Sequence, residues 1–207
     1  MKKIIVSVMV IVGLTLVFAS VNKAAEVDFI VSASIPSASG VSIVATEVNS
    51  STNQFGATVT DLDFDPMVFN SELGIWLPDH YFAIDVGATG GAGSVNVTIT
   101  YSEGAKPIGQ TNGLGFKSTA TFVKITGPED DQLETELISH GPKKLLKDLA
   151  GGEQFTGAEL LGGFLRAYVG IFPGDDADIL GDGGAPFTNA DVPGDYDGTL
   201  TVTATVV

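Results

Sequence analysis

Cysteine is absent from all 207 residues of the chain. Without a thiol, the chain has no attachment point for the lipid of a lipoprotein and no means of forming a disulfide. The stability of an exported protein of this composition therefore has to come from core burial, strand pairing, bound metal or neighbouring subunits.

Catalytic sequence motifs are also lacking. The two histidines, His80 and His140, lie in no G-x-S-x-G or H-E-x-x-H context. We expect His80 to be a turn residue before a strand and His140 to end a helix, where a cation suits the helix dipole. Carboxylates are so numerous that no pair is marked out for glycoside hydrolysis. The sequence predicts that the protein is not an enzyme.

Basic residues are few, and the chain carries a net charge of −15. Removal of residues 1–25 would take Lys2, Lys3 and Lys23 from the 10 basic residues, leaving 7 against 25 acidic ones and a net charge of −18. Such a chain repels nucleic acid and anionic membrane surfaces, so we expect neither as a partner.

Only one long apolar run is present. It spans residues 4–18 after Lys2 and Lys3, which is typical of a secretory signal peptide and short for a membrane span of about 20 residues. We predict that residues 1–25 are removed and that residues 26–207 form one domain that is secreted to the extracellular space or cell surface, with no stable membrane span. An uncleaved N-terminal anchor is the alternative.

Glycine is abundant, at 26 residues, and short alternating segments lie between turns. The pattern predicts an all-β fold, a jelly-roll or immunoglobulin-like antiparallel β-sandwich, with a short helical excursion near residues 129–149 that ends in a helix from Lys143 to Leu149. The expected strands lie at residues 27–35, 41–48, 55–62, 75–77, 81–86, 94–101, 119–125, 164–172 and 199–207.

One acidic, glycine-rich segment, residues 174–184, is a candidate metal site. Its carboxylates resemble the oxygen ligands that calcium prefers, although the EF-hand order is absent. The candidate ligands are Asp175, Asp176, Asp178 and Asp182. A solvated loop is the alternative, and calcium is the one cofactor that the sequence suggests.

At both ends of the predicted domain, residues of two kinds alternate with period two along the chain, so that residues of one kind share a face. Near the C-terminus, Leu200, Val202, Ala204 and Val206 share one face and threonines share the other. At the N-terminal end, the residues that share one face are Val27, Phe29, Val31, Ala33 and Ile35. Pro36 and a Ser/Gly segment follow. Such a strand can leave its own domain and complete the sheet of a neighbour, or it can be the ordinary first strand of a self-contained sandwich.

The last 14 residues, Gly-Asp-Tyr-Asp-Gly-Thr-Leu-Thr-Val-Thr-Ala-Thr-Val-Val, resemble the terminal strand of secreted pilin-like and spore-coat-U-like proteins. The whole layout is similar to the fibre-forming jelly-roll subunits of the TasA/camelysin and archaeal bundling-pilus families. The resemblance implies polymerisation by donor-strand complementation. The Cys pair that is usual in chaperone–usher pilins is absent, so no chaperone dependence is implied, and the type IV pilin processing pattern is absent as well.

The sequence therefore predicts a structural subunit of an extracellular filament, pilus or matrix whose partner is a further copy of itself, joined head to tail. The strand at residues 26–35 would be the donor, and the groove beside Leu200, Val202, Ala204 and Val206 would be the acceptor. The alternative is a monomeric secreted carbohydrate-binding or adhesin domain, with calcium as a candidate stabilising ion. Its marker would be Trp76 or a tyrosine exposed beside an acidic loop.

Overall fold

The computed structural model describes residues 29–34, 40–89, 93–125, 138–139 and 142–207. The predicted signal peptide and two of the predicted donor residues, Val27 and Ile35, lie outside the described residues. The described elements are β1 (Phe29–Ser34), β2 (Val41–Asn49), β3 (Phe55–Val59), β4 (Val68–Asn70), β5 (Ile75–Leu77), β6 (His80–Ala88), β7 (Val95–Glu103), η1 (Leu114–Phe116), β8 (Ser118–Ile125), β9 (Ile138–Ser139), β10 (Lys144–Leu145), η2 (Leu146–Gly151), β11 (Glu153–Phe155), β12 (Phe164–Ile171), α2 (Ala177–Gly181), β13 (Phe187–Thr188) and β14 (Gly198–Val206).

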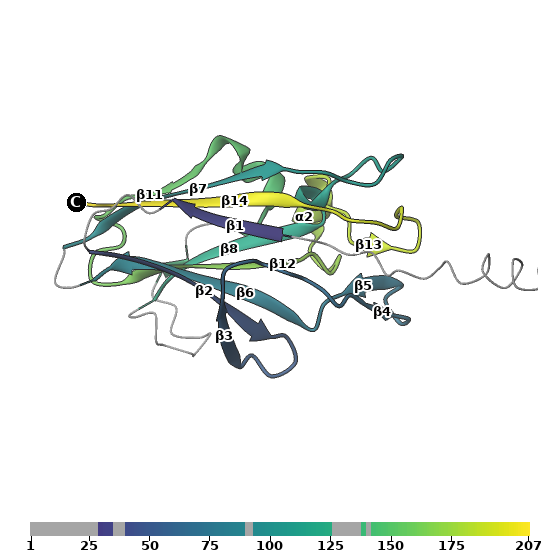
Figure 1. Cartoon of the computed structure of the whole chain (residues 1–207), viewed down its shortest axis with the longest axis horizontal. Coiled ribbons are helices and arrows are strands. Elements are labelled where there is room, and N and C mark those ends of the chain that lie inside the picture. Colours follow the sequence, from purple (N-terminus) through teal and green to yellow (C-terminus); the bar gives the residue numbers. More distant parts are fainter. Residues whose placement is uncertain (1–28, 35–39, 90–92, 126–137, 140–141) are drawn as a thin grey trace, which may run out of the picture.

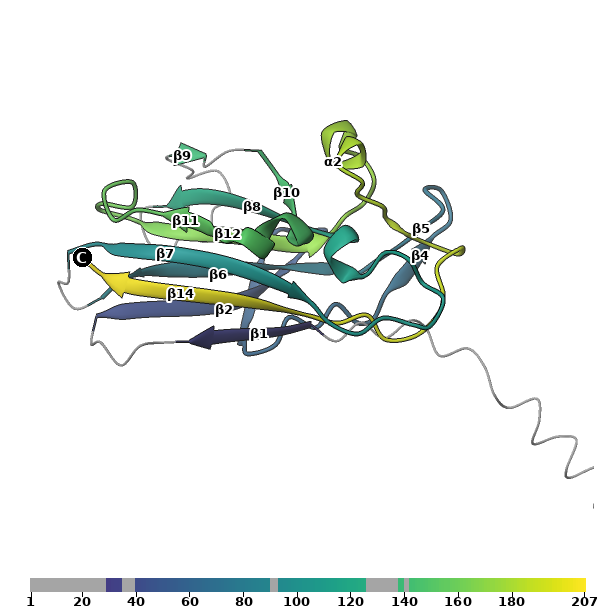
Figure 2. The same ribbon diagram turned by 90° about the horizontal axis from the view of Figure 1, so that it is seen from above.

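Two β-sheets are stacked face to face in a sandwich (Figure 1; Figure 2). Sheet A has the strand order β1-β14-β7-β11, and sheet B has the order β10-β8-β12-β6-β2-β3, with β9 beside β8. A small sheet C, β13-β5-β4, lies at one end of the sandwich (Figure 1). Among the described strands, β1 and β14 form the one parallel pair, and the other ladders are antiparallel.

The alternation of apolar and polar residues decides which face of each strand is buried. In β7 the four expected inward residues, Val95, Val97, Ile99 and Tyr101, are all buried. They share one core cluster with inward residues of sheet B, for example Ile84 of β6 and Phe122 of β8. Because both sheets face this single core, the predicted all-β antiparallel sandwich is confirmed.

The predicted helical excursion is only partly present. Residues 126–137 and 140–141, with His140, lie outside the described residues. Ile138–Ser139 pairs with β8 as a strand, and Lys144–Leu145 pairs with β8 as well, so the predicted helix from Lys143 is wrong in its first residues. The chain becomes helical at Leu146, in the 3-10 helix η2. Tertiary pairing with the edge of sheet B has overridden the local helical pattern here.

Candidate functional site

The predicted donor and acceptor strands lie side by side at one edge of sheet A. β1 runs parallel to β14, from Phe29 opposite Gly198 to Ser34 opposite Thr203. The ladder aligns Val31 with Leu200 and Ala33 with Val202, so predicted donor positions lie next to predicted acceptor positions within one chain. No strand lies on the other side of β1 in sheet A as far as the structure describes it.

Strand β14 is anchored independently of β1. On its other side it pairs with β7 along nine residues, from Gly198 to Val206. The side chains of Leu200, Val202 and Ala204 are fully buried in the core that both sheets share, whereas Val206 is 37% exposed. Three of the four predicted acceptor residues therefore belong to the core, and the fourth lies at the open end of the strand.

The Gly-Asp-Tyr-Asp-Gly turn that leads into β14 is fixed by packing and by main-chain hydrogen bonds that join Asp197 to Gly104 and Ala105. Tyr196 is fully buried, and its hydroxyl donates to the carbonyl of Val192 at 2.8 Å. Burial raises the pKa of Tyr196 to about 12. Gly198 lies against the phenol of Tyr101, where a Cβ atom would overlap the hydroxyl group. The turn thus fixes where β14 begins, and with it the register of β14 at the edge of sheet A.

In the acidic segment at residues 174–184, the predicted metal site, one carboxylate has a structural role. Asp176 caps helix α2, and its side chain accepts hydrogen bonds from the backbone N–H groups of Asp178 and Ile179 at 3.1 and 3.2 Å. Asp182 ends the same helix. Across the described ranges, no cluster of three or more His, Asp or Glu residues is arranged to hold a metal ion. Calcium binding through Asp175 and its neighbours stays a prediction.

His80 is a buried residue at the start of β6. Its Nδ1 lies 2.9 Å from the carboxylate of Asp79, and its Nε2 lies 2.6 Å from the carbonyl oxygen of Asp63. Both partners are acceptors, so both ring nitrogens donate only in the imidazolium form. Burial lowers the pKa of His80, but the bonds to Asp79 and Asp63 outweigh it, and the net shift is upward. This histidine holds the segment before Phe64 against β6.

A buried ion pair that the sequence patterns did not reveal lies on the face of sheet B away from the core. Arg166, the single arginine of the chain, is fully buried and pairs in register with Asp85 of β6. Its Nε and Nη2 donate to the two carboxylate oxygens at 2.6 and 2.7 Å. The ring of Phe55, from β3, lies 4.7 Å from the guanidinium carbon. Burial raises the pKa of Asp85, and the two bonds from Arg166 oppose that shift.

A second buried ion pair ties the segment before β14 to the start of β8. Lys117 Nζ lies 2.5 Å from a carboxylate oxygen of Asp191 and 5.1 Å from the ring centre of Phe187. Asp191 also accepts from the side chain of Gln110 at 2.7 Å and from the backbone N–H of Thr188 at 2.7 Å. Burial by itself raises the pKa of Asp191, but the hydrogen bonds from these donors outweigh it and hold the pKa below its ordinary value.

Trp76, named as a possible binding platform, is half-buried in sheet C. Its indole Nε1 donates to Asn189 at 2.9 Å, and its ring lies 5.2 Å from that of Phe69. The residue therefore acts in packing at the end of the sandwich.

Comparison with protein-family models and with curated proteins gives no match for this chain. Within the part of the chain that the structure describes, no helix has the length and apolar character needed to cross a membrane.

Proposed function

We propose that the protein is a structural subunit of an extracellular filament, pilus or matrix, which polymerises when the N-terminal strand of one chain adds to the sheet of the next. The observation that carries this proposal is the parallel β1–β14 ladder at the edge of sheet A. An edge strand held by a single ladder can be exchanged between chains, because the main-chain bonds formed with a neighbour are the same as those formed within one chain. The extracellular location rests on the predicted signal peptide.

The body of the sandwich supports such an exchange. β14 keeps its full ladder with β7 when β1 leaves, and Leu200, Val202 and Ala204 keep their contacts with the common core. Departure of β1 leaves β14 as a new edge, whose unpaired N–H and C=O groups favour the addition of a strand. When each chain donates to the next and accepts from the previous one, the contact is heterologous and extends into an open fibre.

Deletion of residues 26–35 tests the proposal. We expect the truncated protein to be a folded or destabilised monomer that forms no fibres in negative-stain electron microscopy and no oligomer ladder in size-exclusion chromatography. Fibres like those of the full-length protein would rule out the N-terminal strand as the donor. A sharp monomer from the full-length protein under all conditions, with and without calcium, would favour the alternative of a monomeric secreted binding domain.

A cysteine-pairing experiment separates exchange between chains from pairing within one chain. Because the chain has no native cysteine, each introduced thiol is the only one present. Ser34 and Thr203 face each other in the β1–β14 ladder, and neighbouring strands have Cα distances that a disulfide can bridge. Mixing Ser34→Cys with Thr203→Cys protein, followed by mild oxidation, is expected to give covalent dimers if strands exchange.

The matched control for this experiment is Thr205→Cys. Thr205 is exposed like Thr203 but lies two residues beyond the end of the β1–β14 register. Mixtures of Ser34→Cys with Thr205→Cys should yield far fewer dimers. Equal yields from both mixtures would mean that the cross-links arise from random collisions, and exchange would then have no support.

A further inference from the structure

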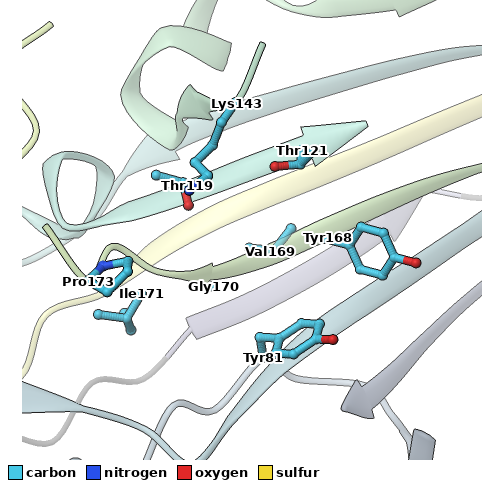
Figure 3. A pocket seen from close by; sticks show the side chains of 9 residues that line it. All are labelled: Tyr81, Thr119, Thr121, Lys143, Tyr168, Val169, Gly170, Ile171 and Pro173. Carbon is cyan, nitrogen blue, oxygen red and sulfur yellow. The ribbon is translucent and has the colours of Figure 1, made fainter. Parts of the chain in front are cut away.

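A groove with an internal volume of about 420 Å³ lies on the outer face of sheet B, away from the strand-exchange edge. Its walls include Tyr81, Tyr168, Thr119, Thr121 and Lys143, with Gly170 at the floor. Figure 3 shows Tyr81 on one side of β12, the two threonines and Lys143 on the other, and Tyr168 projecting from β12 itself. Alternate residues of β12 point into the core, so Tyr168 and Gly170 lie on the opposite face, where both are partly exposed.

The two tyrosines form a corner of the groove. Their ring centres are 6.1 Å apart and the ring planes are inclined by 69°. The hydroxyl of Tyr81 is held by Asn53, to whose side-chain oxygen it donates at 3.2 Å. The electron-rich face of an aromatic ring attracts the weakly positive C–H groups of a pyranose, so this corner suits the apolar face of a sugar.

The floor and the opposite wall offer polar partners. Gly170 lies opposite Thr119 in the β12–β8 ladder, and Tyr168 lies opposite Thr121, so the two threonines share the face of the groove. Gly170 presents bare main chain, and a Cβ atom at this position would lie 3.3 Å from the Cβ of Tyr81. Hydroxyl groups beside an aromatic corner are the combination that recognises a sugar ring, which has hydroxyls at its rim and C–H groups on its face.

The charge at the groove indicates what kind of sugar fits. Lys143 is the one cation among the lining residues of the groove, and its Nζ lies 3.8 Å from the carboxylate of Asp176, which balances it. The chain as a whole is strongly acidic, with a net charge of −15. An anionic polysaccharide would be repelled by this field, whereas a neutral one would not.

We propose that this groove binds a neutral glycan, with one pyranose ring against Tyr81 and Tyr168 and its hydroxyls directed to Thr119, Thr121 and Lys143. The site uses the outer face of sheet B, whereas the proposed assembly uses the edge of sheet A. Glycan binding therefore does not depend on filament formation, and a filament would display the groove along its length.

Isothermal titration calorimetry of the purified protein with neutral tetrasaccharides tests the proposal. The probes are cellotetraose, mannotetraose, chitotetraose and maltotetraose, with tetragalacturonate as the anionic comparison. Tyr81→Ala removes one wall, and Thr121→Tyr fills the groove without removing any buried side chain. Phe69→Ala, which removes an aromatic ring from sheet C, is the matched control.

We expect at least one neutral probe to bind, with roughly tenfold weaker binding in Tyr81→Ala, no detectable binding in Thr121→Tyr and unchanged binding in the control. Circular dichroism confirms that each variant is folded. Failure of every neutral probe at millimolar concentration overturns the proposal. So does binding that survives unchanged in both groove variants, or tighter binding of tetragalacturonate than of any neutral probe.

Discussion

Removing the guanidinium of Arg166 is expected to destabilise the sandwich more than most single substitutions. Arg166→Met keeps much of the side-chain volume but takes away both hydrogen bonds to Asp85, whose side chain is only 8% exposed. Leaving one member of a buried ion pair without its partner costs about 3–5 kcal/mol. For a domain of this size, a loss of about 3 kcal/mol lowers Tm by roughly 6–12 °C.

The dependence of this loss on pH identifies its cause. Without the guanidinium, burial raises the folded-state pKa of Asp85 further above its unfolded value of about 3.9. A carboxyl group with a raised folded pKa binds a proton more tightly in the folded state, so its penalty is complete at high pH and is relieved as pH falls. The free energy of unfolding of Arg166→Met should therefore differ from that of the wild type more at pH 7 than at pH 4.

Urea unfolding followed by the fluorescence of Trp76, the single tryptophan, and by circular dichroism measures these differences. The double variant Arg166→Met/Asp85→Leu is the control, because replacing both charges by apolar groups leaves no buried ion unpaired and is expected to recover most of the stability. A loss below about 1 kcal/mol in Arg166→Met at pH 7, or no recovery in the double variant, would refute the reasoning.

Three further predictions concern single sites. The folded-state pKa of His80 is raised, so the contribution of this histidine to stability is complete below about pH 6.5 and is lost as pH rises through the folded pKa. The urea midpoint of the wild type should therefore fall between pH 6 and pH 9, and His80→Gln should flatten that dependence. The folded-state pKa of Asp191 is lowered, so the contribution of this carboxylate to stability is present above about pH 3.9 and is lost as pH falls through the folded pKa. Asp191→Asn should remove this acid-sensitive contribution and lower the free energy of unfolding by about 3 kcal/mol at pH 7, measured by urea unfolding. Gly198→Ala places a Cβ against the Tyr101 hydroxyl and should cost about 1–3 kcal/mol, whereas Gly151→Ala, where a Cβ meets no neighbour, should leave Tm close to the wild-type value.

Local patterns were sufficient to predict the strands whose alternation is long and regular. The alternation from Val95 to Tyr101 is enough to identify the buried face of that strand, because a sheet that faces a core on one side buries every second residue. The same reasoning holds for Leu200, Val202 and Ala204. Strands such as β13 and β9, with two residues each, carry no period at all, and the ladder with a neighbouring strand is what defines them.

Sequence patterns could not predict the features that depend on contacts between distant parts of the chain. Alternation in β12 predicts that Arg166 leaves the core, but it contains no sign that Phe55, more than 100 residues earlier, covers that position. Likewise, the groove exists because Tyr81 of β6 and Thr119 of β8 lie on either side of Gly170 in β12. In both cases the pairing order of the strands, not the composition of any segment, decides which side chains meet.

The parallel β1–β14 ladder has a further consequence for the proposed assembly. In the proposed assembly, a β1 strand from a neighbour would form the same six-residue ladder that β1 forms within one chain, so the bonds themselves would favour neither state. Only six residues separate Ser34 from Val41 of β2, and so short a tether holds β1 near its own β14 at an effective concentration in the millimolar range. A neighbour competes only when its concentration approaches that value or when other contacts between subunits add to the ladder. Dilute protein should therefore remain monomeric, and fibres should appear as the concentration rises, with deletion of residues 26–35 removing that dependence.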